Sequence, residues 1–282
     1  MKGGYFLFNG QFKKENEPAF HLADLTRRAE GFCETFRAEN NEILFLGSVC
    51  SHLRATANSI GLDLDGIFDL DGRVLRKDVS RLLNKNKLYL SAKIEIQIFP
   101  TEGKINVLLS AEEAERDFFP FKEPGLLLLF YRDLLKEIYP EPVYAPPGFF
   151  IQKAAKRKAD VLNKPNLILL NREECACESI GGSFAYLDKN QVIFPSNSAG
   201  GYCCAIKEQV IKSVKAAGFK PVEKEKISTD DLLHAEEMFL YDPVNGIRKV
   251  LGLEERRYFS PKTKLIAGKL SELAKKERET RG

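Results

Sequence analysis

The chain has 282 residues, enough for one large domain or two smaller ones with a substantial hydrophobic core. Hydrophobic residues make up 44% and charged residues 29%, and the formal net charge of +3 is too small to indicate a nucleic-acid-binding protein. The N-terminus turns polar too early for a signal peptide, and the longest apolar run, residues 126–131, is too short to span a membrane.

The first half of the chain has the pattern of an antiparallel sheet with helices. Asn9-Gly10 is a strong signal for a two-residue hairpin turn. Ile94, Ile96 and Ile98 alternate with polar residues, which is typical of a strand with one buried face. Strands are expected at 5–9, 11–13, 31–38, 43–46, 92–100 and 105–109, and helices at 48–61 and 78–84.

A charged segment that contains two prolines, residues 116–125, interrupts this strand pattern. The interruption predicts a linker between an N-terminal α+β domain, residues 1–115, and a C-terminal α/β domain, residues 126–282. The three phenylalanines of the linker are expected to pack against a domain face or a partner instead of binding a ligand.

The second half alternates apolar strands with helices. Ser228 or Thr229 is expected to cap a short helix, and Gly246 to adopt a positive φ in a loop over residues 244–248. Strands are expected at 126–131, 221–226 and 237–241, and helices at 149–163 and 228–233. Residues 262–281 are expected to form a final basic helix or a frayed tail.

The most informative block is residues 166–211. It is predicted to contain an apolar strand, an acidic turn that ends in Glu178-Ser179, a hairpin, and a glycine turn that opens a helix near Ile206 and Lys207. A buried acid beside a helix start suits a ligand that carries both an anionic group and a protonated heterocycle, because unpaired N–H groups at the helix start bind anions.

Five segments follow one another in an order that resembles the class IV aminotransferases, the fold-type IV proteins that use pyridoxal phosphate (PLP). This group includes branched-chain and D-amino-acid aminotransferases and aminodeoxychorismate lyase. The resemblance implies a two-domain α+β fold and a homodimer with its site near the subunit interface. The segments that carry it are 31–37, 53–62, 178–183, 205–207 and 239–250.

The resemblance also implies positions for a cofactor. Glu178 matches the acid that pairs with the pyridine nitrogen and keeps the ring protonated. Ser179 follows in the same motif. Ile206 and Lys207 lie at the helix start that would bind the cofactor phosphate, Lys207 in place of a hydroxyl donor.

Three positions depart from the family pattern. Ala145 stands where the family has its Schiff-base lysine, which serves as anchor and general base. His52 replaces a phosphate-binding arginine, and Tyr241 replaces a threonine, where a phenol either donates to phosphate or, as we expect, fills the space. Lys136 and Lys153 are the nearest lysines that could replace the missing amine.

The six cysteines predict reduced thiols and a cytoplasmic protein. Four of them flank the expected site. Their convergence would create a zinc site, although the spacing is unlike that of common zinc motifs, and buried thiols are the simpler interpretation. The four are Cys175, Cys177, Cys203 and Cys204.

These observations predict a class IV aminotransferase-like protein with a degenerate PLP site. It is expected to bind a small anionic molecule or to lack transaminase activity. The alternative is an active PLP-dependent aminotransferase or lyase that uses another lysine. Neither nucleic acid nor a membrane is an expected partner.

Overall fold

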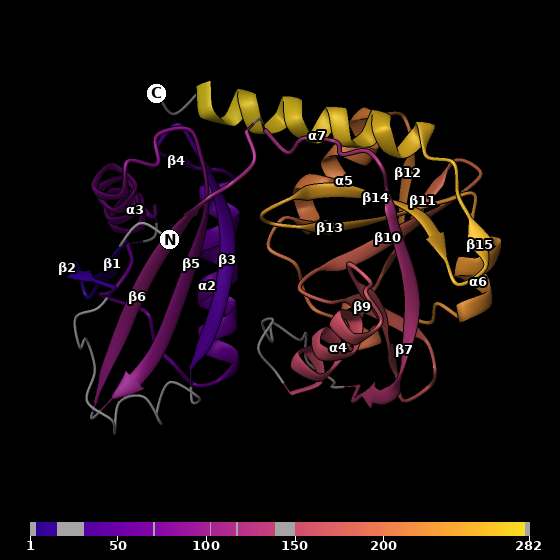
Figure 1. Ribbon diagram of the computed structural model, residues 1–282, viewed down its shortest axis with the longest axis horizontal. Helices are drawn as coiled ribbons and strands as arrows, with labels where there is room; N and C mark the ends of the chain where they lie inside the picture. The colour runs from indigo at the N-terminus through magenta and orange to yellow at the C-terminus, as the bar shows by residue number, and fades with distance from the viewer. Residues whose placement is uncertain are drawn as a thin grey trace. The chain divides into compact units, whose positions relative to one another are not determined.

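The computed structural model describes residues 4–15, 31–69, 71–101, 103–116, 118–138 and 150–279, which form two compact units (Figure 1). The first unit comprises Met1–Phe118 with Glu277–Gly282, and the second comprises Phe119–Lys276. Each unit combines a β-sheet with helices, which confirms the predicted α+β class. Within these described ranges, no helix is long and apolar enough to cross a membrane.

The first unit is built on a six-stranded antiparallel sheet with the order β2-β1-β6-β5-β3-β4. Asn9 and Gly10, both with positive φ, join the first two strands as predicted. The strands are β1 (Tyr5–Phe8), β2 (Gln11–Lys14), β3 (Phe32–Glu39), β4 (Glu42–Ile43), β5 (Ser91–Thr101) and β6 (Lys104–Glu113), and the helices are α2 (Leu46–Ser59) and α3 (Arg73–Asn86).

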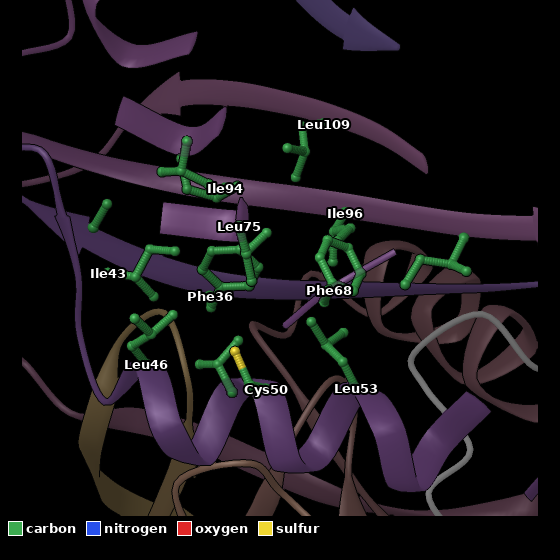
Figure 2. Packing of buried hydrophobic residues seen from close by; sticks show 14 of the residues in the cluster. Phe36, Ile43, Leu46, Cys50, Leu53, Phe68, Leu75, Ile94, Ile96 and Leu109 are labelled. Carbon is green, nitrogen blue, oxygen red and sulfur yellow. The ribbon is translucent and has the colours of Figure 1, made fainter. Parts of the chain in front are cut away.

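The core of the first unit lies between this sheet and its helices. Figure 2 shows Leu46, Cys50 and Leu53 of α2 pointing toward Phe36 and Ile96 of the sheet. These side chains are buried, so the apolar face of α2 and the alternating residues of β5 form one core.

The helix predicted at 78–84 is in fact α3, which begins five residues earlier, at Arg73. Leu75 and Val79 are four residues apart and both are buried. They therefore extend the apolar stripe by one turn on the N-terminal side, so Asp78 lies inside the helix and does not start it.

The strand predicted at 43–46 is also shorter than expected and ends at Ile43. Phe45 adopts a left-handed φ of 55°, and Leu46 begins α2. A left-handed residue cannot continue a strand, so the apolar run is divided between a strand and a helix.

The second unit contains a nine-stranded mixed sheet with the order β12-β11-β10-β13-β14-β7-β8-β9, and β15 pairs with β14 (Figure 1). Its strands are β7 (Leu126–Lys136), β8 (Leu167–Asn171), β9 (Ala176–Ser179), β10 (Ser183–Asp188), β11 (Gln191–Pro195), β12 (Lys220–Lys224), β13 (Glu237–Asp242), β14 (Gly246–Leu253) and β15 (Arg256–Arg257). Its helices are α4 (Phe150–Val161), α5 (Lys207–Ala216), α6 (Thr229–His234), the start of α7 (Pro261–Glu279) and the short 3₁₀ helix η2 (Asn197–Ala199).

Two predictions for the second unit are corrected. Glu178 and Ser179 belong to a strand, not a turn, because β9 pairs with β8 and all four of its residues are buried. The loop predicted at 244–248 ends at Gly246, which does have a positive φ but begins β14. This strand pairs with both β13 and β7, and these tertiary contacts outweigh the turn signal of Asn245-Gly246.

Two helix starts in the second unit are fixed by side chains. Ser228 caps α6 in a capping box with Asp231, as one of the two predicted alternatives stated. Glu237, buried in β13, accepts hydrogen bonds from the backbone N–H groups of Lys262 and Thr263 at 2.9 and 2.7 Å. The sheet therefore holds the first turn of α7 directly.

Candidate functional site

A fully buried carboxylate, that of Glu178, lies in the second unit with three hydrogen-bond donors around it. Lys136 Nζ lies 2.6 Å from its Oε2 atom, and the Tyr202 N–H donates to the same oxygen at 2.7 Å. Gln152 Nε2 donates to Oε1. Because the side chains of Glu178 and Lys136 are only 1% and 9% exposed, the charged pair is desolvated.

Three different elements bring these donors to Glu178. Lys136 ends β7, and Gln152 lies in the first turn of α4, where its Oε1 atom accepts the Gly181 N–H at 3.1 Å. Tyr202 follows a glycine turn. At Gly201 an added Cβ would lie 2.1 Å from the Cys177 carbonyl oxygen, so only glycine allows the chain to pass this close to β9.

The donor set limits what Glu178 can still bind. An ionised carboxylate offers about four acceptor positions, and three are in use here. Lys136 also neutralises its charge. A protonated ring nitrogen would therefore find one free acceptor position and an already compensated carboxylate.

The second feature of the site is the start of α5. Ile206 occupies the N-cap position without a side-chain hydrogen bond to the helix. The Lys207 N–H donates to Cys204 O at 3.0 Å. The Lys207 ammonium is directed to β11 and β12, where it contacts Pro195 O and Glu223 Oε1, each at 3.1 Å. Its charge is thus paired within the protein.

Tyr241 of β13 lies fully buried, with its ring packed against two phenylalanines. The ring centroid is 6.0 Å from that of Phe194 and 6.3 Å from that of Phe239. The hydroxyl has no hydrogen bond of acceptable geometry, although the Ser183 side chain lies near it. Burial, with a smaller contribution from Cys204, raises the pKa of this phenol well above 10.

The other predicted site residues are placed as follows. Ser179 is buried, and its Oγ donates to Ser183 O at 3.4 Å. His52 belongs to the first unit, where its Nε2 atom lies 2.9 Å from Glu34 Oε1 and both side chains are buried. Lys153 is exposed on α4. Ala145 lies outside the described residues.

The four cysteines near the site are free thiols, and three of them have separate hydrogen-bond partners. Cys177 Sγ contacts Leu169 O at 3.4 Å, Cys175 Sγ contacts Glu173 O, and Cys204 Sγ contacts Tyr241 O. Across the described ranges, no group of three or more His, Cys, Asp or Glu residues could hold a metal ion.

Sequence reasoning missed two partners of Glu178. Gln152 is a buried polar residue on α4, a helix with exposed basic residues. That contrast was the only signal for Gln152. Tyr202 contributes a backbone N–H, which no side-chain pattern can reveal. Lys136 was considered only as a replacement for the Schiff-base lysine.

Comparisons with known proteins agree with the predicted resemblance. The family model for class IV aminotransferases matches residues 31–253. A probable branched-chain-amino-acid aminotransferase from Thermotoga maritima is 21% identical over 267 residues, which cover 94% of this chain and 93% of that protein.

Solved structures show the same fold. The branched-chain aminotransferase from Thermoproteus uzoniensis, crystallised with norvaline, superposes with a TM-score of 0.83 at 19% identity, covering 98% of this chain and 97% of that chain. A hypothetical aminotransferase from Mycobacterium tuberculosis, in its PLP-bound form, gives a TM-score of 0.82 at 12% identity and covers 98% and 100%.

Proposed function

The chain belongs to the class IV aminotransferase family, and from that premise we propose that it binds a small anionic molecule without forming a Schiff base to PLP. The observation that carries the proposal is the buried ion pair between Lys136 and Glu178, 2.6 Å apart. In this pair the acid expected to bind the ring nitrogen is bound to a lysine.

The position of the lysine amine matters because of the shape of the cofactor. In PLP the ring nitrogen and the aldehyde carbon lie on opposite sides of the pyridine ring. An amine that binds Glu178 is therefore at the nitrogen end, where it cannot reach the aldehyde. Lys136 is also the one buried lysine among the described residues, and the partly buried Lys207 is paired with Glu223.

These residues do not fit a covalently held cofactor. A Schiff base needs an uncharged amine directed at the aldehyde, and the same amine would serve as the general base of transamination. Lys136 instead donates to a carboxylate, and the resemblance implies that Ala145 stands at the lysine position.

The anionic part of the proposal is supported by the start of α5 and by Tyr241. The helix start lacks a side-chain cap, and its N–H groups with the helix dipole favour an anion. The Tyr241 hydroxyl is a buried donor without a hydrogen bond of acceptable geometry. A phosphate or carboxylate group of a ligand is the partner that we propose for these donors.

Incubation of the purified protein with PLP tests the proposal. We expect no Schiff-base absorption band and, after borohydride reduction and peptide mapping, no stoichiometric pyridoxyl-lysine. Heat-unfolded protein treated in the same way controls for random labelling of surface lysines. Separately, inorganic phosphate should raise the Tm more than chloride at equal ionic strength.

The alternative is an active aminotransferase or lyase, and the burial of Lys136 at the site is the observation that favours it. This function would require Lys136 to leave Glu178. A one-to-one adduct on Lys136 or Lys153, together with turnover of an amino acid, would establish this alternative and end the proposal above.

We also propose that the chain forms a homodimer, because class IV aminotransferases are typically oligomeric. Sedimentation velocity measures this directly. A single monomeric species at micromolar concentration would contradict it.

A further inference from the structure

We infer that the Lys136 ammonium takes the place of a ligand's protonated ring nitrogen, so that the protein supplies its own counter-ion to Glu178. The inference rests on the proposed function and deepens it, because it concerns which ligands the same site selects. It predicts a site that recognises an anionic group but gains nothing from a basic ring nitrogen.

The geometry of the carboxylate supports this substitution. Oε2 accepts both Lys136 Nζ and the Tyr202 N–H, at 2.6 and 2.7 Å, and Gln152 covers Oε1. A buried carboxylate needs a compensating charge and hydrogen bonds. The protein already provides both, so a ligand cation at this position would be redundant.

Lys136 is held in place by its backbone as well as its side chain. It ends β7 and pairs with Asn171 of β8, and its carbonyl oxygen accepts the Arg172 N–H at 2.9 Å. The ammonium is therefore presented by the end of an interior strand, which has β14 and β8 as its neighbours. A ligand would have to displace a fixed charge in order to reach Oε2.

The consequence is a change in ligand class. The wild-type site should accept a phosphorylated or carboxylated molecule whose ring is neutral or absent. Removal of the lysine should restore selection for a protonated pyridine, because Glu178 would then be buried without its counter-ion.

Two phosphorylated probes that cannot form a Schiff base test this inference by calorimetric titration. One is 4-deoxypyridoxine 5′-phosphate, which carries a basic ring nitrogen, and the other is benzyl phosphate, which has none. Wild-type protein should bind both with similar Kd. In Lys136→Ala the pyridine probe should bind at least about tenfold tighter and benzyl phosphate should be unchanged.

Two matched variants control for charge. Lys136→Arg keeps the cation and should behave like wild type. Lys158→Ala removes a partly exposed lysine of α4 that pairs with Asp133, and it should have no effect on either probe. A wild-type protein that already prefers the pyridine probe tenfold would overturn the inference, as would Lys136→Ala without a preference.

If neither probe binds any of the proteins, the anion site of the proposed function is wrong. The inference about Lys136 is then tested by thermal stability. Methylammonium chloride should raise the Tm of Lys136→Ala more than sodium chloride does, and it should not raise that of wild type. Equal effects of the two salts on Lys136→Ala would overturn the inference.

If Lys136→Ala does not fold, the double variant Lys136→Ala/Glu178→Gln replaces it. A folded double variant supports the inference, since removing the carboxylate charge then repairs the loss of the ammonium. An unfolded double variant overturns it.

Discussion

The two ends of the candidate site differ in how far the protein satisfies its own polar groups. At one end, Glu178 has a cation, an amide and a backbone N–H bound to its carboxylate. At the other end, the Tyr241 hydroxyl has no hydrogen bond of acceptable geometry, and the start of α5 has no side-chain cap. The comparison shows that the protein satisfies the polar groups at one end of the site with its own residues and leaves polar groups unsatisfied at the other end.

The largest expected effect on stability comes from removing Glu178. This residue lies at the end of the site where the protein satisfies its own polar groups, the closed end; the end with Tyr241 and the start of α5 is the open end. Glu178→Ala leaves the Lys136 ammonium buried without its counter-ion and should lower the free energy of unfolding by about 3–5 kcal/mol. The partly exposed pair of Lys158 and Asp133 is the control, and Lys158→Ala should cost less than about 1 kcal/mol. Urea denaturation measures both losses of stability. Equal losses would mean that the buried pair of Glu178 and Lys136 does not stabilise the fold more than an exposed pair does.

The Gln152 amide at the closed end should contribute less to the free energy of unfolding than the ion pair does. Gln152→Leu removes one donor from Glu178 and leaves the Gly181 N–H without its acceptor, so we expect a loss of about 1–3 kcal/mol. Lys153→Ala, one residue along α4 but exposed, should stay within about 0.5 kcal/mol of wild type. A larger loss in the control than in Gln152→Leu would refute the role of the amide.

At the open end, removal of a polar group should affect ligand binding more than stability. Tyr241→Phe removes a hydroxyl that makes no acceptable hydrogen bond, so stability should change by less than about 1 kcal/mol, while affinity for benzyl phosphate should fall about tenfold. Tyr258→Phe is the converse control. That hydroxyl donates to Leu232 O at 2.7 Å, and its loss should cost about 1 kcal/mol without changing affinity.

The smallest effect concerns pH. Burial raises the pKa of Tyr241 well above 10, so the phenol stays protonated between about pH 6 and 8 and binding there should follow only the ionisation of the ligand. Since the folded-state pKa exceeds the unfolded one, the stability that this group contributes is complete below about pH 10 and is lost as the pH rises further. Tyr241→Phe should therefore lose less stability than wild type in alkaline denaturation, and identical curves would contradict this.

The sequence predicted features that depend on neighbouring residues. The Asn9-Gly10 turn, the alternation of β5 and the cap at Ser228 are local, and the structure contains all three. The start of the strand β14 was missed because the local Asn245-Gly246 signal indicates a turn, whereas the pairing with two neighbouring strands is long-range.

In the candidate site, too, the sequence predicted the local feature and missed the long-range contacts. Glu178 was found from its motif, but its lysine partner lies 42 residues away and its amide partner 26 residues away. Such pairings depend on how three elements meet in space. The spacing of residues along the chain does not specify them.

The attachment of α7 to Glu237 has a consequence for how the protein is made. Glu237 lies in the same strand as Tyr241, and its carboxylate is bound by Lys262 and Thr263, about 25 residues later in the chain. A nascent chain that has not yet reached these residues would have to bury this carboxylate without its donors or leave the strand unpaired. The second unit therefore should complete its folding only after residues 262 and 263 have been synthesised, and a chain truncated before Pro261 should be less stable than the full chain.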